Sequence, residues 1–575
     1  MSLDSLGNDP PRLRSAFGTP SLRGDRWVWI VLGYSFAGLL IIVLSGLTKR
    51  IYQVPVDAQL GLFQLLPPAY WIGLSLMAVA TALSVWRKSD GLTAITGVLL
   101  LATLSGTPTF FEPVPRYWDA YSHFAEAQQL TWTGNLSAFA DAYSANWPGA
   151  FLVMWVFASA GGIAPLDFLG LYPFVTGGIT FLAIFELLRS TFGAKIAREA
   201  SVPTALFTVW AQYHVSPQSI GFVLFLLILA TWQQKETRWR LLAATLFVGL
   251  VVSHPTSAIL LLTVLIFNAG VSHIGKRRGQ PARDEARRRS WFPTRVAVTY
   301  AIVWLAWLFF LAVGSSDAAR TAILNKMDMI LGVPEQTLNL ATHRTVDNPL
   351  TLAPRIRTAS LGIYGVFGLV SLVALFRDRL SRDLFRMILC TLIGAAFVAV
   401  ADIFAFGGQF YDRSLLLLGT FLPALCFAGL SRIRIPANVR RAVVVALVCA
   451  SVATASTAYY LEAFNIVTPE AVAGANFVNT LPPSSVVVDG KLPAMVWIPP
   501  DERVHVTHTT FADLRQTPLD SLDPGLPVYA IYDPTAALWY RQWYGADLYR
   551  SYYDARTNYS LIYDNGWTTV FAVHD

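Results

Sequence analysis

Long apolar runs alternate with short polar loops along most of the chain. The first run, Trp27–Leu47, is followed by Ala69–Trp86 and Leu92–Leu104. Ten further runs of similar character follow, at Leu166–Leu188, Val202–Tyr213, Ile220–Trp232, Leu241–Val252, Ala258–Val271, Arg295–Val313, Ala359–Phe376, Leu384–Phe406, Ser414–Leu430 and Ala442–Leu461. Such runs are typical of membrane-spanning helices. The pattern predicts an α-helical polytopic membrane protein with about 13 transmembrane helices.

A shorter run, Ala150–Ile163, does not fit this alternation as a span. If it crossed the membrane, Leu166–Leu188 would end outside and carry Arg189, Lys195 and Arg198 with it. That placement violates the rule that basic loops face the cytoplasm. A helix that lies along or dips into the outer surface restores the register, and a run of about 14 residues suits such a helix. We therefore predict an interfacial or re-entrant helix here.

Charge supports this topology. Only 14% of the 575 residues are charged, and the net charge is +7, whereas soluble domains contain about 25% charged residues. The basic residues concentrate in short loops, above all between Lys276 and Arg289, and four arginines lie in residues 1–26. The positive-inside rule then predicts a cytoplasmic N-terminal segment, 1–26, and an outward end of the last span. Nothing in this distribution suggests a nucleic-acid partner.

The composition changes from Glu462 onward. Pro469–Thr480 has the pattern of a helix, and Ser485–Asp489 and Val528–Tyr532 have that of buried strands. Tyr559–Tyr563 and Thr568–Val573 flank a turn that contains Asn565-Gly566 and predict a hairpin. We therefore expect three parts, which are the segment 1–26, a membrane domain 27–461 with outer loops at 105–165 and 314–358, and an extracytoplasmic α/β domain 462–575.

Candidate chemistry begins just after the third apolar run. Asp119, His123 and Glu126 are spaced i, i+4 and i+7, so a helix places them on one face. The same spacing has a structural interpretation, with Asp119 as a helix N-cap and the other two as a solvated face or a support for Asp119. Ionisable groups beside a membrane nevertheless mark a candidate site.

On this topology, six further polar residues fall on the outer side or near it. They are Ser216, Gln218, His254, Arg344, Asp402 and Arg413. Their convergence predicts a cavity that opens at headgroup level on the outer face. Structural interpretations remain open here too, because Ser216 and His254 could cap or turn helices and Arg413 could be an interfacial anchor.

Several short motifs together resemble the fold-C (GT-C) superfamily of polyprenyl-phosphate-dependent integral-membrane glycosyltransferases. The first outer loop contains Tyr117-Trp118-Asp119-Ala120-Tyr121-Ser122-His123, followed by Asn146-Trp147-Pro148-Gly149. The later segments that carry the resemblance are Ser216-Pro217-Gln218, Ser253-His254-Pro255-Thr256, Asp412-Arg413-Ser414-Leu415 and the tail Tyr563-Asp564-Asn565-Gly566. The resemblance implies a GT-C-like membrane domain and a sugar donor linked to a polyprenyl phosphate and used at the outer face.

The resemblance also implies roles for the candidate residues. Asp119 would be the catalytic base that deprotonates an acceptor hydroxyl. Arg413, with Arg344 or His254, would bind the departing phosphate, since guanidinium pairs with phosphate in a bidentate manner. His123 or Glu126 would orient Asp119 or bind the acceptor. Ser216, Gln218 and Asp402 complete the predicted substrate-binding set.

The acceptor on this interpretation is an envelope glycan, lipid or protein. The tail lacks a Trp-Trp-Asp-Tyr-Gly motif, which argues against protein N-glycosylation by an oligosaccharyltransferase. A divalent metal occurs in that branch of the family, and the face with Asp119 could hold one, but we favour no metal or other cofactor. The alternatives are an envelope polysaccharide polymerase or ligase, and a non-enzymatic transporter or flippase of a lipid-linked glycan.

Overall fold

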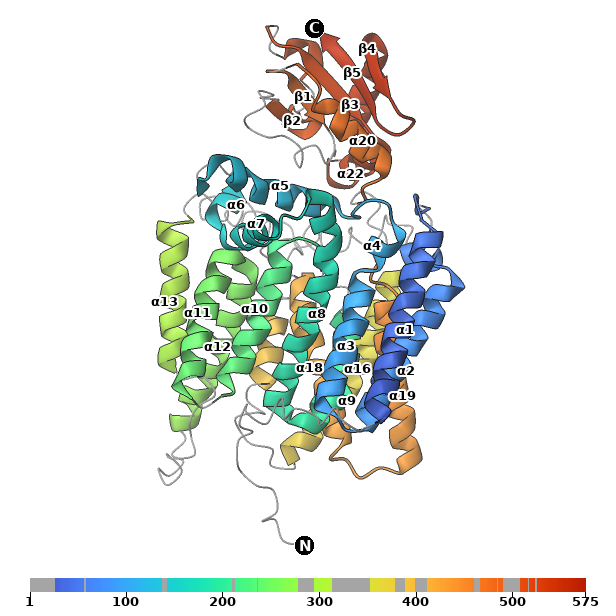
Figure 1. The fold of residues 1–575 in the computed structure, drawn as a ribbon. Helices are drawn as coiled ribbons and strands as arrows, with labels where there is room; N and C mark the ends of the chain where they lie inside the picture. The colour runs from blue at the N-terminus through green and yellow to red at the C-terminus, as the bar shows by residue number, and fades with distance from the viewer. Residues whose placement is uncertain are drawn as a thin grey trace.

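The protein is a helical bundle with a small domain at one end, as seen in the computed structural model (Figure 1). The structure describes residues 26–574 except 56–57, 137–141, 209–212, 235, 278–293, 313–351, 378–387, 399–410, 460–465, 483, 490–506, 515–516, 523–524 and 545. Three helices, α5 (Trp118–Thr133), α6 (Ala142–Asn146) and α7 (Gly149–Gly161), lie across one end of the bundle (Figure 1). This end is called the capped end below, and the C-terminal domain sits on the same end.

Among the described residues, five helices are long and apolar enough to cross a membrane. They are α1 (Arg26–Thr48), α2 (Pro68–Trp86), α8 (Pro165–Phe192), α16 (Leu352–Arg377, over Leu352–Leu375) and α19 (Ala437–Ala455). In α16 and α19 only 28% and 22% of the apolar window is buried inside the protein, so most of each surface is available to lipid. The chain is therefore a multi-pass membrane protein.

Shorter apolar helices fill the bundle between these five. They are α3 (Asp90–Ser105), α10 (Pro217–Trp232), α12 (Pro255–Arg277), α13 (Thr294–Phe310), α18 (Tyr411–Leu430) and the segment Ile388–Val398. The remaining membrane-domain helices are α4 (Thr107–Phe111), α9 (Ala194–Thr208) and α11 (Thr237–Ser253). The number of spans, about 13 by the sequence pattern, stays a prediction.

The run Ala150–Ile163 corresponds to α7, which lies across the capped end (Figure 1); that it does not span the membrane stays a prediction. Its Gly149 packs against the end of α11 so closely that a Cβ there would lie 2.6 Å from Ser253 Oγ. Its other side carries exposed Val156 and Phe157. A helix with one face on the bundle and an apolar face exposed is suited to lie at a membrane interface.

One predicted boundary differs from the structure. The pattern placed Lys195 and Arg198 in a loop before a span beginning at Val202, whereas α9 already begins at Ala194. The break between α8 and α9 is a single residue, Gly193, with a φ of +86°. Arg198 lies within α9 and pairs with Asp90 at the start of α3. Because a basic residue with a carboxylate partner need not leave a helix, charge alone misplaced this boundary.

The C-terminal domain is built on a five-stranded mixed sheet of order β2-β1-β3-β5-β4. Strand β1 (Val486–Asp489) runs parallel to β2 (Thr507–Thr510) and β3 (Val528–Tyr532), and β5 (Thr569–His574) pairs antiparallel with β3 and β4 (Ser560–Asp564). The helices of the domain are α20 (Pro469–Val478), α21 (Phe511–Leu514), α22 (Pro534–Tyr544) and α23 (Ala546–Ala555). Every residue of β3 is buried, as an apolar strand in the middle of a sheet requires.

The sequence predicted much of this domain. The expected helix, the strands at β1 and β3 and the β4–β5 hairpin are all present. Strand β2 was not predicted, because Thr507-His508-Thr509-Thr510 has no apolar pattern and is held only by its parallel pairing with β1. Two hydrophobic clusters stabilise the domain, one of which joins α20 and the sheet to the core beneath α5.

Candidate active site

Helix α5 holds the predicted catalytic segment at the capped end. Its inward face buries Tyr121, Phe124 and Ala125 against α7 and α8. This amphipathic packing leaves Asp119 and His123 half-buried on the neighbouring face. Tyr117 occupies the N-cap position, so Asp119 is not a cap as the structural interpretation had it; it lies in the first turn, where the helix dipole favours a carboxylate.

The start of α5 is fixed by two local contacts and one long-range contact. Arg116 forms a buried ion pair with Glu112, and its backbone carbonyl accepts a hydrogen bond of 2.8 Å from the backbone N–H of Val467. The hydroxyl of Tyr121 donates to the carbonyl of Pro115 at 3.0 Å. Burial raises the pKa of Glu112, and the Arg116 guanidinium opposes that shift. These contacts position Asp119 relative to both the bundle and the C-terminal domain.

Glu126 has a structural contact. Its side chain is 4% exposed, and Oε2 accepts a hydrogen bond of 3.0 Å from Ser144 Oγ in α6. A buried carboxylate that receives a hydroxyl in this way ties α6 to α5. Of the three predicted residues, Glu126 thus holds α6 against α5. Asp119 and His123 are the two that remain partly accessible.

A residue that the sequence did not single out, His214, completes this cluster. It lies in the turn between α9 and α10, is 4% exposed, and packs against Tyr117 with ring centroids 4.6 Å apart and the ring planes tilted by 31°. Burial lowers the pKa of His214 to about 4; the Asp119 carboxylate opposes this shift, and His123 adds to it. Within the described residues, neither ring nitrogen has a hydrogen-bond partner. The imidazole is therefore neutral at pH 7 and lies within electrostatic reach of Asp119 and His123.

The adjacent turn explains Ser216. Its Oγ accepts a hydrogen bond of 3.3 Å from the backbone N–H of Ser219 and so caps α10, with Pro217 at the first helical position. The hydroxyl of Tyr172 in α8 lies 2.7 Å from Ser219 Oγ. Ser216 is 3% exposed, so its observed contacts are those of a cap, as the structural interpretation proposed.

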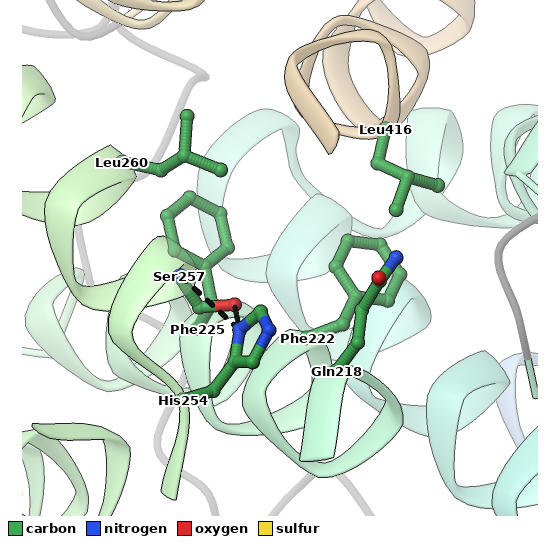
Figure 2. A pocket seen from close by; sticks show the side chains of 7 residues that line it. All are labelled: Gln218, Phe222, Phe225, His254, Ser257, Leu260 and Leu416. Carbon is green, nitrogen blue, oxygen red and sulfur yellow. Dashed lines mark hydrogen bonds between the residues drawn. The ribbon is translucent and has the colours of Figure 1, made fainter. Parts of the chain in front are cut away.

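Gln218 and His254 line one small cavity between α10 and α12, together with Leu416 of α18 (Figure 2). His254 ends α11 and is 2% exposed. Its Nδ1 lies 2.8 Å from Ser257 Oγ and accepts a hydrogen bond of 3.3 Å from the backbone N–H of Ser257. Since Nδ1 accepts, the neutral ring carries its proton on Nε2.

A glycine permits this arrangement. A Cβ at Gly221 would lie 2.8 Å from His254 Cβ and 3.0 Å from Ser257 Oγ. Any larger residue at position 221 of α10 would displace the turn between α11 and α12. The close approach therefore brings His254 beside Gln218 at the capped end.

Three predicted residues cannot be placed in the cavity from side-chain contacts. Arg344 and Asp402 lie outside the described residues, and Arg413 is described only as part of the backbone of α18. Leu416, three residues after Arg413 in the same helix, does line the cavity with Gln218 and His254. Within the described ranges, no group of three or more His, Cys, Asp or Glu side chains is arranged to hold a metal ion.

No protein-family model and no curated protein sequence matches the chain. Its structure is similar to the oligosaccharyltransferase of Archaeoglobus fulgidus in the apo form, with 12% identity, a TM-score of 0.48, and coverage of 85% of this chain and 74% of the other. The same enzyme complexed with zinc and sulfate gives 11% identity, a TM-score of 0.45, and 83% and 73% coverage.

A second solved structure is similar over nearly its whole length. It is ArnT from Cupriavidus metallidurans bound to undecaprenyl phosphate, with 12% identity, a TM-score of 0.45, and coverage of 85% of this chain and 98% of the other. The predicted resemblance thus has counterparts among solved structures.

Proposed function

We propose that the chain is an integral-membrane glycosyltransferase that moves a sugar from a polyprenyl-phosphate-linked donor to an envelope glycan, lipid or protein acceptor. The observation that carries this proposal is the cluster of Asp119, His123 and His214 at the capped end of an apolar bundle. A substrate with a polyprenyl tail is held in the bilayer, so its reactive phosphate can be met only at headgroup level, where Asp119 and His123 are half-buried and His214 is buried beside them.

Asp119 is the general base on this proposal. Its carboxylate accepts the proton of the acceptor hydroxyl while the hydroxyl oxygen forms a bond to the anomeric carbon of the donor. The bond between that carbon and the phosphate oxygen breaks, and its electron pair leaves with the polyprenyl phosphate. Within the described residues, the Asp119 side chain makes no hydrogen bond or ion pair, so its oxygens are available to a substrate.

Other groups would bind the two substrates. His254 can donate from Nε2, and Gln218 from its amide, to one phosphate oxygen (Figure 2). Their cavity, of about 20 Å³, has room for a single oxygen-sized group, so the rest of the phosphate would lie outside it. Arg413, at the start of α18, supplies the positive charge if its side chain points toward the same site; Arg344 and Asp402 stay candidates from the sequence. His123 is proposed to orient Asp119 or to contact the acceptor. The capped end faces outward on this proposal, with residues 1–26 in the cytoplasm.

The decisive variant is Asp119→Asn, with Asp167→Asn as its matched control. Both residues are acidic and lie in the first turn of a helix, but Asp167 of α8 is exposed. The assay follows sugar transfer from a panel of polyprenyl-phosphate hexoses and pentoses to an envelope extract, with purified protein in nanodiscs. We expect Asp119→Asn to lower turnover by about 10²–10⁴-fold, the usual contribution of a general base, and to leave donor binding intact.

Two results would contradict this assignment. Wild-type turnover in Asp119→Asn excludes the general-base role, provided that Asp167→Asn behaves like wild type. Movement of a lipid-linked glycan across the membrane without any glycosidic product would instead identify a transporter or flippase.

A further inference from the structure

The C-terminal domain contains a cavity of about 600 Å³ that none of the chemistry above uses. It lies between the sheet and helices α22 and α23, and its lining includes Tyr532, Asp533, Tyr549, Tyr553, Asp564 and Trp567. This volume is in the range of binding sites for small molecules, which are commonly aromatic with a few fixed polar groups. We call it the aromatic pocket.

The aromatic rings of the pocket are held rigidly. Tyr532 and Tyr549 are buried, and their hydroxyls donate to the carbonyls of Tyr552 at 2.8 Å and of Asp533 at 3.3 Å. Because those hydroxyls are engaged inside the protein, the two residues present ring surface to the cavity. Tyr553 is 40% exposed at the edge, and the Arg556 guanidinium lies 3.4 Å from the centroid of its ring. One ring face of Tyr553 is therefore covered, which fixes its orientation.

Two carboxylates in the pocket are fixed as well. Asp533 Oδ1 accepts a hydrogen bond of 2.9 Å from the backbone N–H of Ala536 at the start of α22, and the side chain is 5% exposed. Asp564 Oδ1 accepts one of 2.8 Å from the backbone N–H of Gly566. Each carboxylate thus has one oxygen bound in a turn, so its orientation toward the cavity is set in advance.

The indole of Trp567 is the feature that points to a ligand. Its Nε1 is buried and has no hydrogen-bond partner within the described residues. A buried donor without a partner is unfavourable. A ligand oxygen that accepts from it would therefore form a hydrogen bond without breaking one inside the protein. Trp567 thus brings both ring surface and a donor without a partner to the lining of the pocket.

We propose that the aromatic pocket binds a neutral oligosaccharide, the acceptor glycan of the sugar transfer proposed above, on which this inference rests. Sugar hydroxyls can donate to the carboxylates of Asp533 and Asp564 and accept from Trp567 Nε1, while the C–H faces of the sugar rings pack on the aromatic walls. One cation, Arg550, also lines the pocket, but its side chain is exposed and pairs with Asp554 at 3.6 Å. The two carboxylates of the lining therefore disfavour an anionic chain, because like charges repel in a partly desolvated site.

The location of the pocket fits an acceptor. Pro534 and Trp567 also line a second cavity, of about 400 Å³, at the junction between the two domains. That cavity reaches Glu112 and Val114, the segment that leads into α5 and Asp119. A glycan held in the aromatic pocket would have its end directed along this junction toward the proposed base.

The test is calorimetric binding of neutral tetrasaccharides of hexoses and of pentoses to the full chain in nanodiscs. The Asp119→Asn background keeps binding separate from turnover. Trp567→Phe retains a ring but removes the donor, and we expect a Kd about tenfold higher, as the loss of one hydrogen bond predicts. Tyr553→Ala removes an exposed wall of the pocket together with its ring contacts to Tyr532 and Tyr549, and it should weaken binding by a similar factor. Trp539→Phe, on α22 outside the pocket, is the matched control and should bind as the parent does.

Three outcomes overturn the proposal. They are no binding of any neutral tetrasaccharide, equal affinity in the parent and both pocket variants, and binding confined to uronic-acid saccharides or to peptides. These results leave the turnover test of Asp119 untouched. Conversely, saccharide binding that depends on Trp567 would stand even if Asp119→Asn transferred sugar normally.

Discussion

Two buried histidines at the capped end differ in the hydrogen bonding of their ring nitrogens. His254 and His214 each lie in a turn that leads into a helix beginning with proline, α12 and α10, and they are 2% and 4% exposed. His254 Nδ1 is bound by the backbone N–H and hydroxyl of Ser257, which fixes its tautomer. His214 packs against the tilted ring of Tyr117, and within the described residues neither of its nitrogens has a hydrogen-bond partner.

The difference indicates that the protein is less stable at His214 than it would be with a paired imidazole there. A buried imidazole without hydrogen bonds costs about 1–3 kcal/mol relative to one that is paired. Groups left unpaired in this way are expected where a substrate is to supply the missing partner. The turn before α10 also brings His214 close to Asp119 and His123. We therefore infer that His214 contacts the acceptor or Asp119 during the reaction, while His254 holds a fixed donor toward the cavity with Gln218.

The largest expected effect that tests this comparison is on turnover in His214→Gln. Glutamine keeps a polar group but cannot reproduce the neutral imidazole beside Asp119. We expect kcat for sugar transfer to fall by about 10²-fold, at the lower end of acid–base contributions. The free energy of unfolding should fall by no more than about 1 kcal/mol, since the imidazole has no hydrogen bond to lose and only its ring contact with Tyr117 is removed. The measurements are initial rates over a range of donor concentrations and thermal unfolding in nanodiscs.

His254→Gln is the matched control. It removes the bond to Ser257, so we expect a loss of stability of about 1–2 kcal/mol and a raised KM for donor with kcat nearly unchanged. The comparison fails if the two variants have the same profile, or if His214→Gln is strongly destabilised and fully active.

A smaller effect concerns pH. Burial holds the pKa of His214 at about 4 in the folded state, below the usual value of about 6.5 in an unfolded chain. The unfolded state therefore binds the proton first as pH falls. The free energy of unfolding should be unaffected above about pH 6.5 and decrease between that pH and about 4, by at most about 3 kcal/mol from this residue. Thermal unfolding from pH 7.5 to 4 measures it.

His214→Gln isolates this contribution, because it removes the group that titrates. We expect the unfolding temperature of the variant to fall less steeply with acidification than that of wild type. Identical slopes would mean that His214 is accessible to protons in the folded state and is not the buried neutral group described here.

The sequence predicted the parts of this molecule that depend on local pattern. The apolar runs became helices, the 14-residue run became α7 across the end of the bundle, and Val528–Tyr532 became β3 with the bounds expected. The spacing of Asp119, His123 and Glu126 placed them on one helix. Local periodicity is sufficient in these cases, because each element is defined by the alternation of apolar and polar positions along its own length.

The features missed by the sequence depend on distant contacts. His214 becomes notable only when the turn before α10 meets Tyr117, and it has no motif of its own beyond preceding Ser216-Pro217-Gln218 by two residues. The Glu112–Arg116 ion pair is important because Arg116 also meets Val467, far along the chain. The aromatic pocket forms where strands and helices from different parts of the domain pack together. The periodicity of apolar and polar positions in the sequence does not predict such contacts, since tertiary packing determines them.

The most direct test of the proposed function is a density map of the full chain bound to a non-hydrolysable polyprenyl-phosphate sugar. We predict that the phosphate lies at the cavity of Gln218 and His254, and that the anomeric carbon lies beside Asp119 with His214 Nδ1 or Nε2 in contact with a substrate oxygen. A donor phosphate at the opposite end of the bundle, or an anomeric carbon out of reach of Asp119, would contradict the account.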